Sequence, residues 1–481
     1  MKDRQVWLQL LFIVGFTVIN VFVFSMSESK IENGRSYHPA FWNASDGQRY
    51  WGVAINVAGK GSFTINTADD EPLKRSGPLS AIVFALPIAL VGFEKSAVWI
   101  VIIQCGMLFG AGLLGRTLGM PYGANPNILQ AVLIFNPSLI SLAHHAQSDL
   151  LFMFLCSLFL FLVVGLLREP RSWNIGRLVS IGIVAGLLPL ARPLGLYYIM
   201  LVPGIVLIAV ATMEQSTRPS RNAVISGLLV SSLIAAIVLT PWGLRNKAVF
   251  GEFSLTHSEG IQMEWHYNAL QKYQSSDRKP EDKKVDFERY NVDENCIGDP
   301  RCKYGVTRAY IDAMWDTPKI EIAKALLMSW CKLFLAGGAS QLSRYLGLNA
   351  PATDEYLWNI KQVTHDVRNI VDNWMQNSSF WVLFLITIIY TIICRAVGLI
   401  GLLVVIRDRA TLRYTFLHVG TIAIFLAMYL FSGISRFRAP LEPALALFFA
   451  IGIGALFARH NRVKEKTTQQ FDHPRAEDGN D

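Results

Sequence analysis

Long apolar blocks alternate with shorter polar segments along most of this chain. The longer blocks have about the length that an α-helix needs to cross the hydrocarbon core of a membrane. Helices are expected because a chain inside lipid must satisfy its backbone hydrogen bonds within each segment. The pattern therefore predicts an all-α integral membrane protein with about ten spans. These spans cover residues 6–24, 97–115, 128–142, 150–167, 178–191, 196–212, 224–240, 380–406, 412–431 and 441–457.

Two other apolar segments are predicted not to cross. Residues 78–91 form a run of only about fourteen residues that Pro78 and Pro87 interrupt, a length typical of a re-entrant or interfacial segment. Counting this run as a span would place the later arginine-rich loops outside, against the positive-inside rule. Residues 321–337 contain Glu321, Lys324 and Lys332, which favour an interfacial amphipathic helix.

The orientation follows from the cations beside the spans. Lys2 and Arg4 precede the first span, and no small-residue cleavage site follows it, so we expect a retained helix rather than a signal peptide. Basic residues also follow the last span. Both termini are therefore predicted to be cytoplasmic, in a multi-pass membrane protein.

This topology divides the chain into four regions. Residues 1–240 are predicted to form an N-terminal transmembrane core that includes a first external loop, residues 27–96. Residues 241–379 form a large external region with interfacial helices, and residues 380–458 return to the membrane. Residues 459–481 lack apolar periodicity and are predicted to be a disordered cytoplasmic tail.

Composition supports the membrane assignment, since 52% of the residues are hydrophobic and 17% are charged. The net charge of +8 does not indicate a nucleic-acid partner, because the cations lie in loops beside apolar segments. Most of the six cysteines lie within or beside apolar segments. Cys296 and Cys302 lie instead in a polar loop, and they are predicted to form a disulfide if that loop faces an oxidising compartment.

Several chemical groups gather at the predicted external ends of the spans. Asp46 is a candidate general base, or alternatively a helix cap. Asp149 is a second candidate catalytic carboxylate, and its alternative is also a cap. His144 and His145 together with Asp149 are a possible divalent-metal site, although a pair of interfacial histidines is the simpler reading; no other cofactor is indicated. The candidate phosphate-binding cations, for which the alternative is snorkelling anchors, are Lys74, Arg75, Arg192, Arg245, Arg436 and Arg438.

The sequence contains no Walker loop, dinucleotide-binding glycine fingerprint, nucleophile elbow or HExxH motif. Four other pieces carry a resemblance to a known family. They are Asp46-Gly47-Gln48-Arg49-Tyr50-Trp51, Arg75-Ser76-Gly77-Pro78-Leu79, Pro241-Trp242-Gly243-Leu244-Arg245-Asn246 and Ser435-Arg436-Phe437-Arg438-Ala439-Pro440. In this order they resemble elements of the GT-C glycosyltransferases, particularly the bacterial relatives of protein O-mannosyltransferases and the lipid A aminoarabinose transferase.

The resemblance implies a GT-C fold and transfer of a hexosyl or pentosyl group from a polyprenyl-phosphate donor, such as an undecaprenyl phosphate sugar. The resemblance also implies a bacterial inner (cytoplasmic) membrane protein. The acceptor would be a glycan, lipid or protein of the cell envelope, reached at an external, periplasmic active site. Asp46 would take the acceptor proton, the arginines would bind the donor phosphate, and a single displacement would invert the anomeric centre. Two alternatives stay open. One is a transporter or flippase of a lipid-linked sugar, and the other is a polyprenyl-diphosphate glycan polymerase or ligase.

Overall fold

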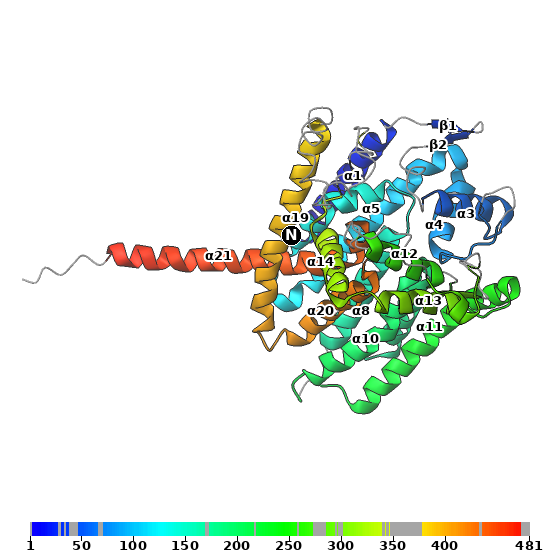
Figure 1. Ribbon diagram of the computed structural model, residues 1–481. Helices are drawn as coiled ribbons and strands as arrows, with labels where there is room; N and C mark the ends of the chain where they lie inside the picture. Colours follow the sequence, from blue (N-terminus) through cyan, green and yellow to red (C-terminus); the bar gives the residue numbers. More distant parts are fainter. Residues whose placement is uncertain are drawn as a thin grey trace, which may run out of the picture.

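A computed structural model describes most of the chain and shows a bundle of long helices with shorter helices at one end (Figure 1). The described residues are 2–26, 30–32, 35–37, 47–65, 71–168, 173–215, 218–256, 259–272, 285–293, 296, 302–338, 342, 346, 378–431 and 435–472. Asp46 lies outside these residues.

The N-terminal part contains a short antiparallel hairpin among its helices. The hairpin pairs β1 (Lys30–Glu32) with β2 (Arg35–Tyr37). The helices are α1 (Lys2–Ser25), α3 (Gly47–Lys60), α4 (Leu79–Val91), α5 (Phe93–Leu118), η1 (Met120–Tyr122), α6 (Pro126–Ile134), α7 (Pro137–Ala143), α8 (Asp149–Arg168), α9 (Ile175–Ala191), α10 (Leu194–Ala211) and α11 (Arg221–Phe250).

The rest of the described chain is also helical. Its elements are α12 (Glu259–Lys272), η4 (Glu288–Tyr290), α13 (Lys303–Trp315), α14 (Lys319–Leu335), α19 (Ser378–Ile406), α20 (Leu412–Tyr429), η7 (Ser435–Leu441) and α21 (Glu442–Asp472).

Eight helices of the described chain are long and apolar enough to cross a membrane. The prediction of an all-α, multi-pass membrane protein is confirmed. The number of spans is smaller than the ten predicted, because two of the predicted spans are not single helices of sufficient length. Helix α9 has 17 residues, or about 26 Å at 1.5 Å per residue, somewhat less than the hydrocarbon thickness of about 30 Å. Helix α4 has 13 residues and is shorter still, as expected for residues 78–91.

The predicted third span, residues 128–142, is wrong as a single helix. The segment is divided into α6 and α7, whose axes differ by 57°. The break lies at Asn136-Pro137, where proline removes a backbone donor and the Asn136 side chain accepts a hydrogen bond from the Ser138 amide at 3.0 Å. The pair is one broken span or a re-entrant loop, and counting it as one span raises the number of candidates to nine.

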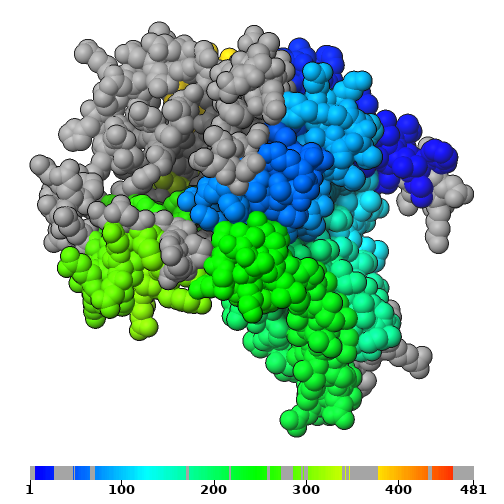
Figure 2. All heavy atoms as spheres, turned by 90° about the vertical axis from the view of Figure 1, so that its right-hand side faces the viewer, coloured from blue at the N-terminus to red at the C-terminus, as the bar shows by residue number. Residues whose placement is uncertain are grey.

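Helix α11 extends ten residues beyond the predicted end of its span at Thr240. Pro241 lies inside it, and the next residue, Trp242, packs in a cluster with Val53 and Leu73. The helix ends at Gly251, which adopts a φ of 81° and donates its amide to the Lys247 carbonyl. The C-terminal end of α11 lies beside the segment around α3, which appears as adjoining green and blue surfaces in Figure 2.

Helix α8 is the central helix of the bundle, since most of its side chains are buried. Helix α9 packs on it and approaches α11 closely. An added Cβ at Gly182 would lie 2.7 Å from Cβ of Ile234, and at Gly186 2.6 Å from Cβ of Val238. Small residues at these positions bring the two backbones together, as is common between membrane helices. This packing places the first residue of α8 and the last residues of α9 at the same end of the bundle.

Helix α21 continues to Asp472 and projects away from the bundle (Figure 1). The prediction of disorder from residue 459 therefore differs from the structure over residues 459–472, whereas residues 473–481 lie outside the described part. Lys, Arg, Glu and Gln, which are good helix formers, make up half of residues 459–472.

Candidate functional site

A cavity of about 120 Å³ lies at the end of the bundle where α8 begins and α9 ends. All the helix ends around it belong to the predicted external side. The described residues that line it are Arg49, Tyr50, Arg75, Ser76, Arg192, Pro193, Leu194, Ile261, Gln262, Trp265, His266, Met428, Tyr429 and Phe437. They come from segments that are far apart in the sequence, so the cavity exists only in the folded protein.

Three arginines line this cavity, each delivered by a different segment. Arg49 is in the first turn of α3, a helix that buries Tyr50 and Trp51 against its neighbours. Arg75 lies in the loop before α4, and Arg192 is the C-cap residue of α9. No aspartate or glutamate is among the described lining residues. The cavity therefore presents positive charge to whatever enters it.

The loop that carries Arg75 is held against α9 by backbone packing. A Cβ at Gly77 would collide with the carbonyl group of Leu190, so only glycine allows this approach. Pro78 then precedes the first residue of α4. Arg75 itself is exposed, and within the described part of the chain it makes no ion pair or hydrogen bond. Its guanidinium is thus available for a ligand.

Arg192 is fixed by Asp149, the first residue of α8. Its Nη1 donates a hydrogen bond to Oδ1 of Asp149, and the two side chains are 11% and 3% exposed. Its guanidinium also lies over the Phe437 ring, 5.0 Å from the centroid. Because Asp149 pairs with Arg192, it positions this guanidinium and offsets its charge.

The remaining wall is uncharged and largely aromatic. Tyr429 and Phe437 stack with their centroids 4.8 Å apart and their planes inclined by 7°. Helix α12 contributes Ile261, Gln262, Trp265 and His266. Burial lowers the pKa of His266 to about 4, while a hydrogen bond to the Met428 backbone acts in the opposite direction. His266 is accordingly neutral at neutral pH.

The predicted site residues fall into three groups. Arg75 and Arg192 line the cavity, and Asp149 lies directly behind it. Asp46 lies outside the described residues, immediately before α3. The other four predicted cations are not among the described lining residues; they are Lys74, Arg245, Arg436 and Arg438. Lys74 pairs with Glu71 at 2.8 Å, and Arg436 lies over Phe437 at 5.2 Å.

Arg245 is directed toward the protein backbone. It donates to the carbonyl oxygens of Leu73 at 3.1 Å and Phe63 at 3.0 Å. Its guanidinium also lies 4.8 Å from the centre of the Trp242 ring. These contacts hold the polar segment after α3 against the C-terminal end of α11. In this arrangement Arg245 supports the loop that carries Arg75 and does not reach the cavity.

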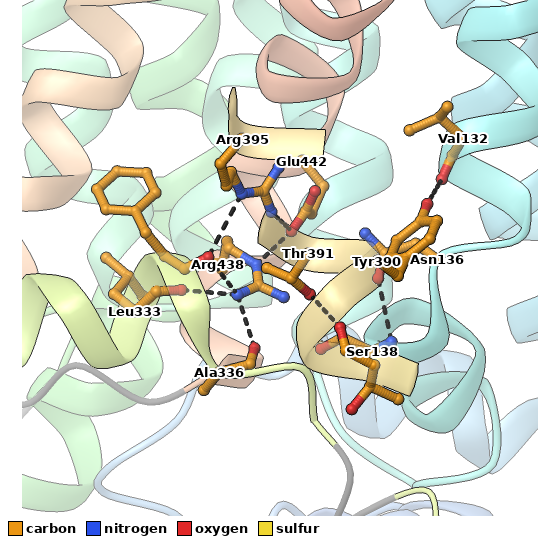
Figure 3. Close-up of polar contacts among 12 residues, drawn as sticks. Val132, Asn136, Ser138, Leu333, Ala336, Tyr390, Thr391, Arg395, Arg438 and Glu442 are labelled. Carbon is orange, nitrogen blue, oxygen red and sulfur yellow. Dashed lines mark hydrogen bonds and ion pairs between the residues drawn. The ribbon is translucent and has the colours of Figure 1, made fainter. Parts of the chain in front are cut away.

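Arg438 is also enclosed by protein (Figure 3). It is 1% exposed and donates to Glu442 and to the carbonyl oxygens of Leu333 and Ala336, the latter two both at 2.8 Å. Glu442 also forms an ion pair with Arg395, whose Nη2 lies 2.6 Å from Oε1 of Glu442. Arg438 therefore anchors the C-terminal end of α14 to η7 and α21, and its donors are satisfied by this contact.

The described residues contain no group of three His, Cys, Asp or Glu side chains arranged to hold a metal ion. His144 is fully buried, with its Nε2 2.8 Å from Oδ1 of Asn20 and its ring stacked on Phe24. The possible metal site formed by His144, His145 and Asp149 thus gains no support from the described geometry. Nearby, the Tyr50 hydroxyl lies 3.0 Å from the Ser148 hydroxyl and joins α3 to the start of α8.

Cys296 and Cys302 lie as a bonded pair, with their Cα atoms 6.0 Å apart. Cys302 is the N-cap residue of α13, and neither cysteine is among the described residues that line the cavity. It is a feature of the predicted external region, in agreement with the expected disulfide.

Sequence reasoning missed the contribution of α12 and of Arg49. Gln262, Trp265 and His266 are spaced by three and four residues, as on one helix face. That spacing was the available signal, although it does not show which neighbour the face meets. Arg49 was part of a quoted motif, but only the position of α3 shows that it accompanies Arg75 and Arg192.

No family model and no curated protein matches the sequence. Two solved structures of ArnT from Cupriavidus metallidurans are similar to the chain, one bound to undecaprenyl phosphate and one in the apo state. Their TM-scores are 0.40, with sequence identities of 12% and 14%. The matches cover 93% and 94% of this chain and 78% of the ArnT chain. A similarity this low does not establish a shared activity.

Proposed function

We propose that this protein is an inverting, GT-C-type glycosyltransferase that moves a sugar from a polyprenyl-phosphate donor to an acceptor at the external face of the membrane. The observation that carries the proposal is the convergence of Arg49, Arg75 and Arg192 on one cavity at the end of a membrane bundle. A lipid-linked phosphate has both properties that this site favours. Its anionic group suits the arginines, and its apolar tail suits the membrane beside the cavity.

The arginines suit both binding and chemistry. A guanidinium presents several donors in a plane and binds phosphate oxygens in pairs. As the bond between the anomeric carbon and the phosphate oxygen breaks, negative charge grows on the leaving phosphate. Cations already in position stabilise that charge more strongly in the transition state than in the ground state. Asp149 contributes by holding Arg192 in place.

The acceptor requires a base, and Asp46 is the candidate. In the sequence it directly precedes α3 and lies three residues before Arg49, which lines the cavity. In the proposed step the acceptor oxygen or nitrogen attacks the anomeric carbon, its proton passes to Asp46, and the bond electrons leave with the phosphate. One displacement of this kind inverts the anomeric configuration.

The test uses the full-length protein purified in detergent. Synthetic decaprenyl phosphates carrying different hexoses and pentoses are incubated with it and an envelope extract, and products are identified by mass spectrometry. We expect a glycosylated lipid, glycan or protein to form, and its formation to be lost in the Arg49→Ala/Arg75→Ala double variant. Failure of the wild-type protein to bind decaprenyl phosphate at all would refute the proposal.

A further inference from the structure

Helix α12 presents one continuous face to the cavity that the arginines line. Ile261, Gln262, Trp265 and His266 follow the spacing of a single helix face, and all four are lining residues. Trp265 is 49% exposed although it borders a cavity. An indole this accessible beside a charged pocket offers a flat apolar surface to a ligand.

This face differs from the arginine side in its charge. Gln262 and Trp265 carry no charge, and the neighbouring His266 is held neutral by burial. Phe437 and Tyr429 are also uncharged, and they connect this face to Arg192, whose guanidinium lies over the Phe437 ring. The cavity therefore has a cationic part and a neutral part rich in aromatic rings and hydrogen-bonding groups. A ligand that fits both parts carries a phosphate next to an uncharged polar group.

A sugar ring matches the neutral part for two physical reasons. One face of a pyranose or furanose carries C–H groups with partial positive charge, which pack on the negative face of an aromatic ring. Its hydroxyls both donate and accept hydrogen bonds, and so does the Gln262 amide. A second cation in place of Gln262 or His266 would instead favour a second anionic group.

We infer that the α12 face, with Trp265 at its centre and Gln262 beside it, is the subsite for the sugar of the lipid-linked donor. The inference rests on the proposed function, because the arginines must hold the phosphate for the sugar to reach α12. In this arrangement the arginines recognise the phosphate common to all such donors, whereas α12 selects which sugar is accepted.

The experiment compares two ligands on the full-length protein in detergent. Binding of bare decaprenyl phosphate is measured beside binding of a panel of decaprenyl phosphates that carry single hexoses or pentoses. Wild type is expected to bind at least one panel member more tightly than the bare lipid phosphate. Trp265→Ala should reduce that preference about tenfold, a loss typical of one aromatic contact. Trp265→Phe should retain part of it, and bare-lipid affinity should stay unchanged.

Trp315→Ala is the matched control. Trp315 ends α13, is 66% exposed and is not among the described residues that line the cavity. Its removal should change neither affinity. A Trp265→Ala variant that loses both ligands equally would show that the indole is a structural or interfacial anchor, which overturns the inference.

Three other results separate the possibilities further. If no panel sugar improves on the bare lipid, the subsite assignment fails although the phosphate site stands. If Trp265→Ala reduces turnover while donor preference is unchanged, the face contacts the acceptor and the inference is again overturned. If the wild-type protein does not bind bare decaprenyl phosphate, the proposed function itself fails, which is a distinct outcome.

Discussion

Arg192 at the end of α9 donates a hydrogen bond to Asp149 at the start of α8, and both side chains are largely buried beside a cavity. The pair connects two helices that are neighbours in the bundle, and it turns one guanidinium toward the same space as Arg49 and Arg75. A buried ion pair of this kind contributes little net stability, but loss of one partner leaves an uncompensated charge. Its value lies in positioning.

Asp149→Ala should therefore destabilise the protein by about 3–5 kcal/mol, because Arg192 remains buried without its anion. Asp149→Asn keeps an acceptor and should cost less. The double variant Asp149→Leu/Arg192→Met removes both charges and should recover much of the stability while donor binding remains impaired. Thermal unfolding in detergent and decaprenyl phosphate binding measure the two effects. Wild-type stability in Asp149→Ala would show that the ion pair is not formed in solution.

Arg75 provides a contrasting prediction, because the described structure gives it no protein partner. Arg75→Ala should leave the melting temperature within about 2 °C of wild type, as for most surface substitutions. Affinity for decaprenyl phosphate should fall about tenfold or more, the loss of a charge-assisted hydrogen bond. Arg75→Lys should not restore it, because the planar pair of donors is absent. Unchanged affinity in both variants would leave Arg75 as a surface anchor.

Arg245 should behave in the opposite way. Arg245→Ala removes hydrogen bonds to the Leu73 and Phe63 carbonyls, and we expect a loss of roughly 1–3 kcal/mol in stability. Lipid phosphate affinity measured well below the melting temperature should change less than about twofold. Comparing Arg75→Ala with Arg245→Ala tests the assignment directly. If Arg245→Ala lost much of its affinity for lipid phosphate at normal stability, Arg245 would bind the phosphate after all.

Asp46 gives the fourth prediction. Asp46→Asn preserves size but cannot take a proton, so turnover should fall by about two to four orders of magnitude. Stability and donor binding should remain near wild type. Asparagine caps a helix as well as aspartate does, so a cap alone would make this variant almost silent while Asp46→Ala would be destabilised. Product formation by mass spectrometry, measured for both variants with donor binding alongside, separates the two roles.

His266 makes stability depend on pH in a defined window. Burial lowers its pKa to about 4, below the ordinary value of about 6.5, so the unfolded chain binds a proton first as the pH falls. The contribution of neutral His266 to the free energy of unfolding is complete above pH 6.5. It is lost progressively toward pH 4, by about 3 kcal/mol at most. Protonation would also place a fourth cation beside Arg49, Arg75 and Arg192.

His266→Gln keeps a donor for the Met428 carbonyl but does not titrate in this range. Melting temperatures of this variant should fall less steeply than those of wild type between pH 6.5 and pH 4.5. Carboxylates titrate in both proteins, so the difference between the two curves isolates His266. Identical slopes would mean that the imidazole is not buried in solution.

The apolar blocks by themselves determined the class of protein and most of its spans, because in lipid each long apolar run must become a helix. They also indicated that residues 78–91 are too short to cross, and that Arg75 and Arg192 lie at one side. These features depend on length, hydrophobicity and neighbouring charge, which are properties of consecutive residues and can be read from the sequence alone.

Only the tertiary structure decided what each arginine does. Arg245 and Arg438 have the same side chain as Arg75 and lie in equally suggestive motifs, yet their donors meet carbonyl groups more than 100 residues away in the sequence. Whether a guanidinium faces a backbone or a cavity depends on which distant segment packs beside it, and no local pattern encodes that. The same applies to α12, because only the tertiary structure shows that Gln262, Trp265 and His266 line the same cavity as the arginines. Sequence placed the charges near the predicted membrane surface, and packing brought Arg49, Arg75 and Arg192 to the lining of one cavity.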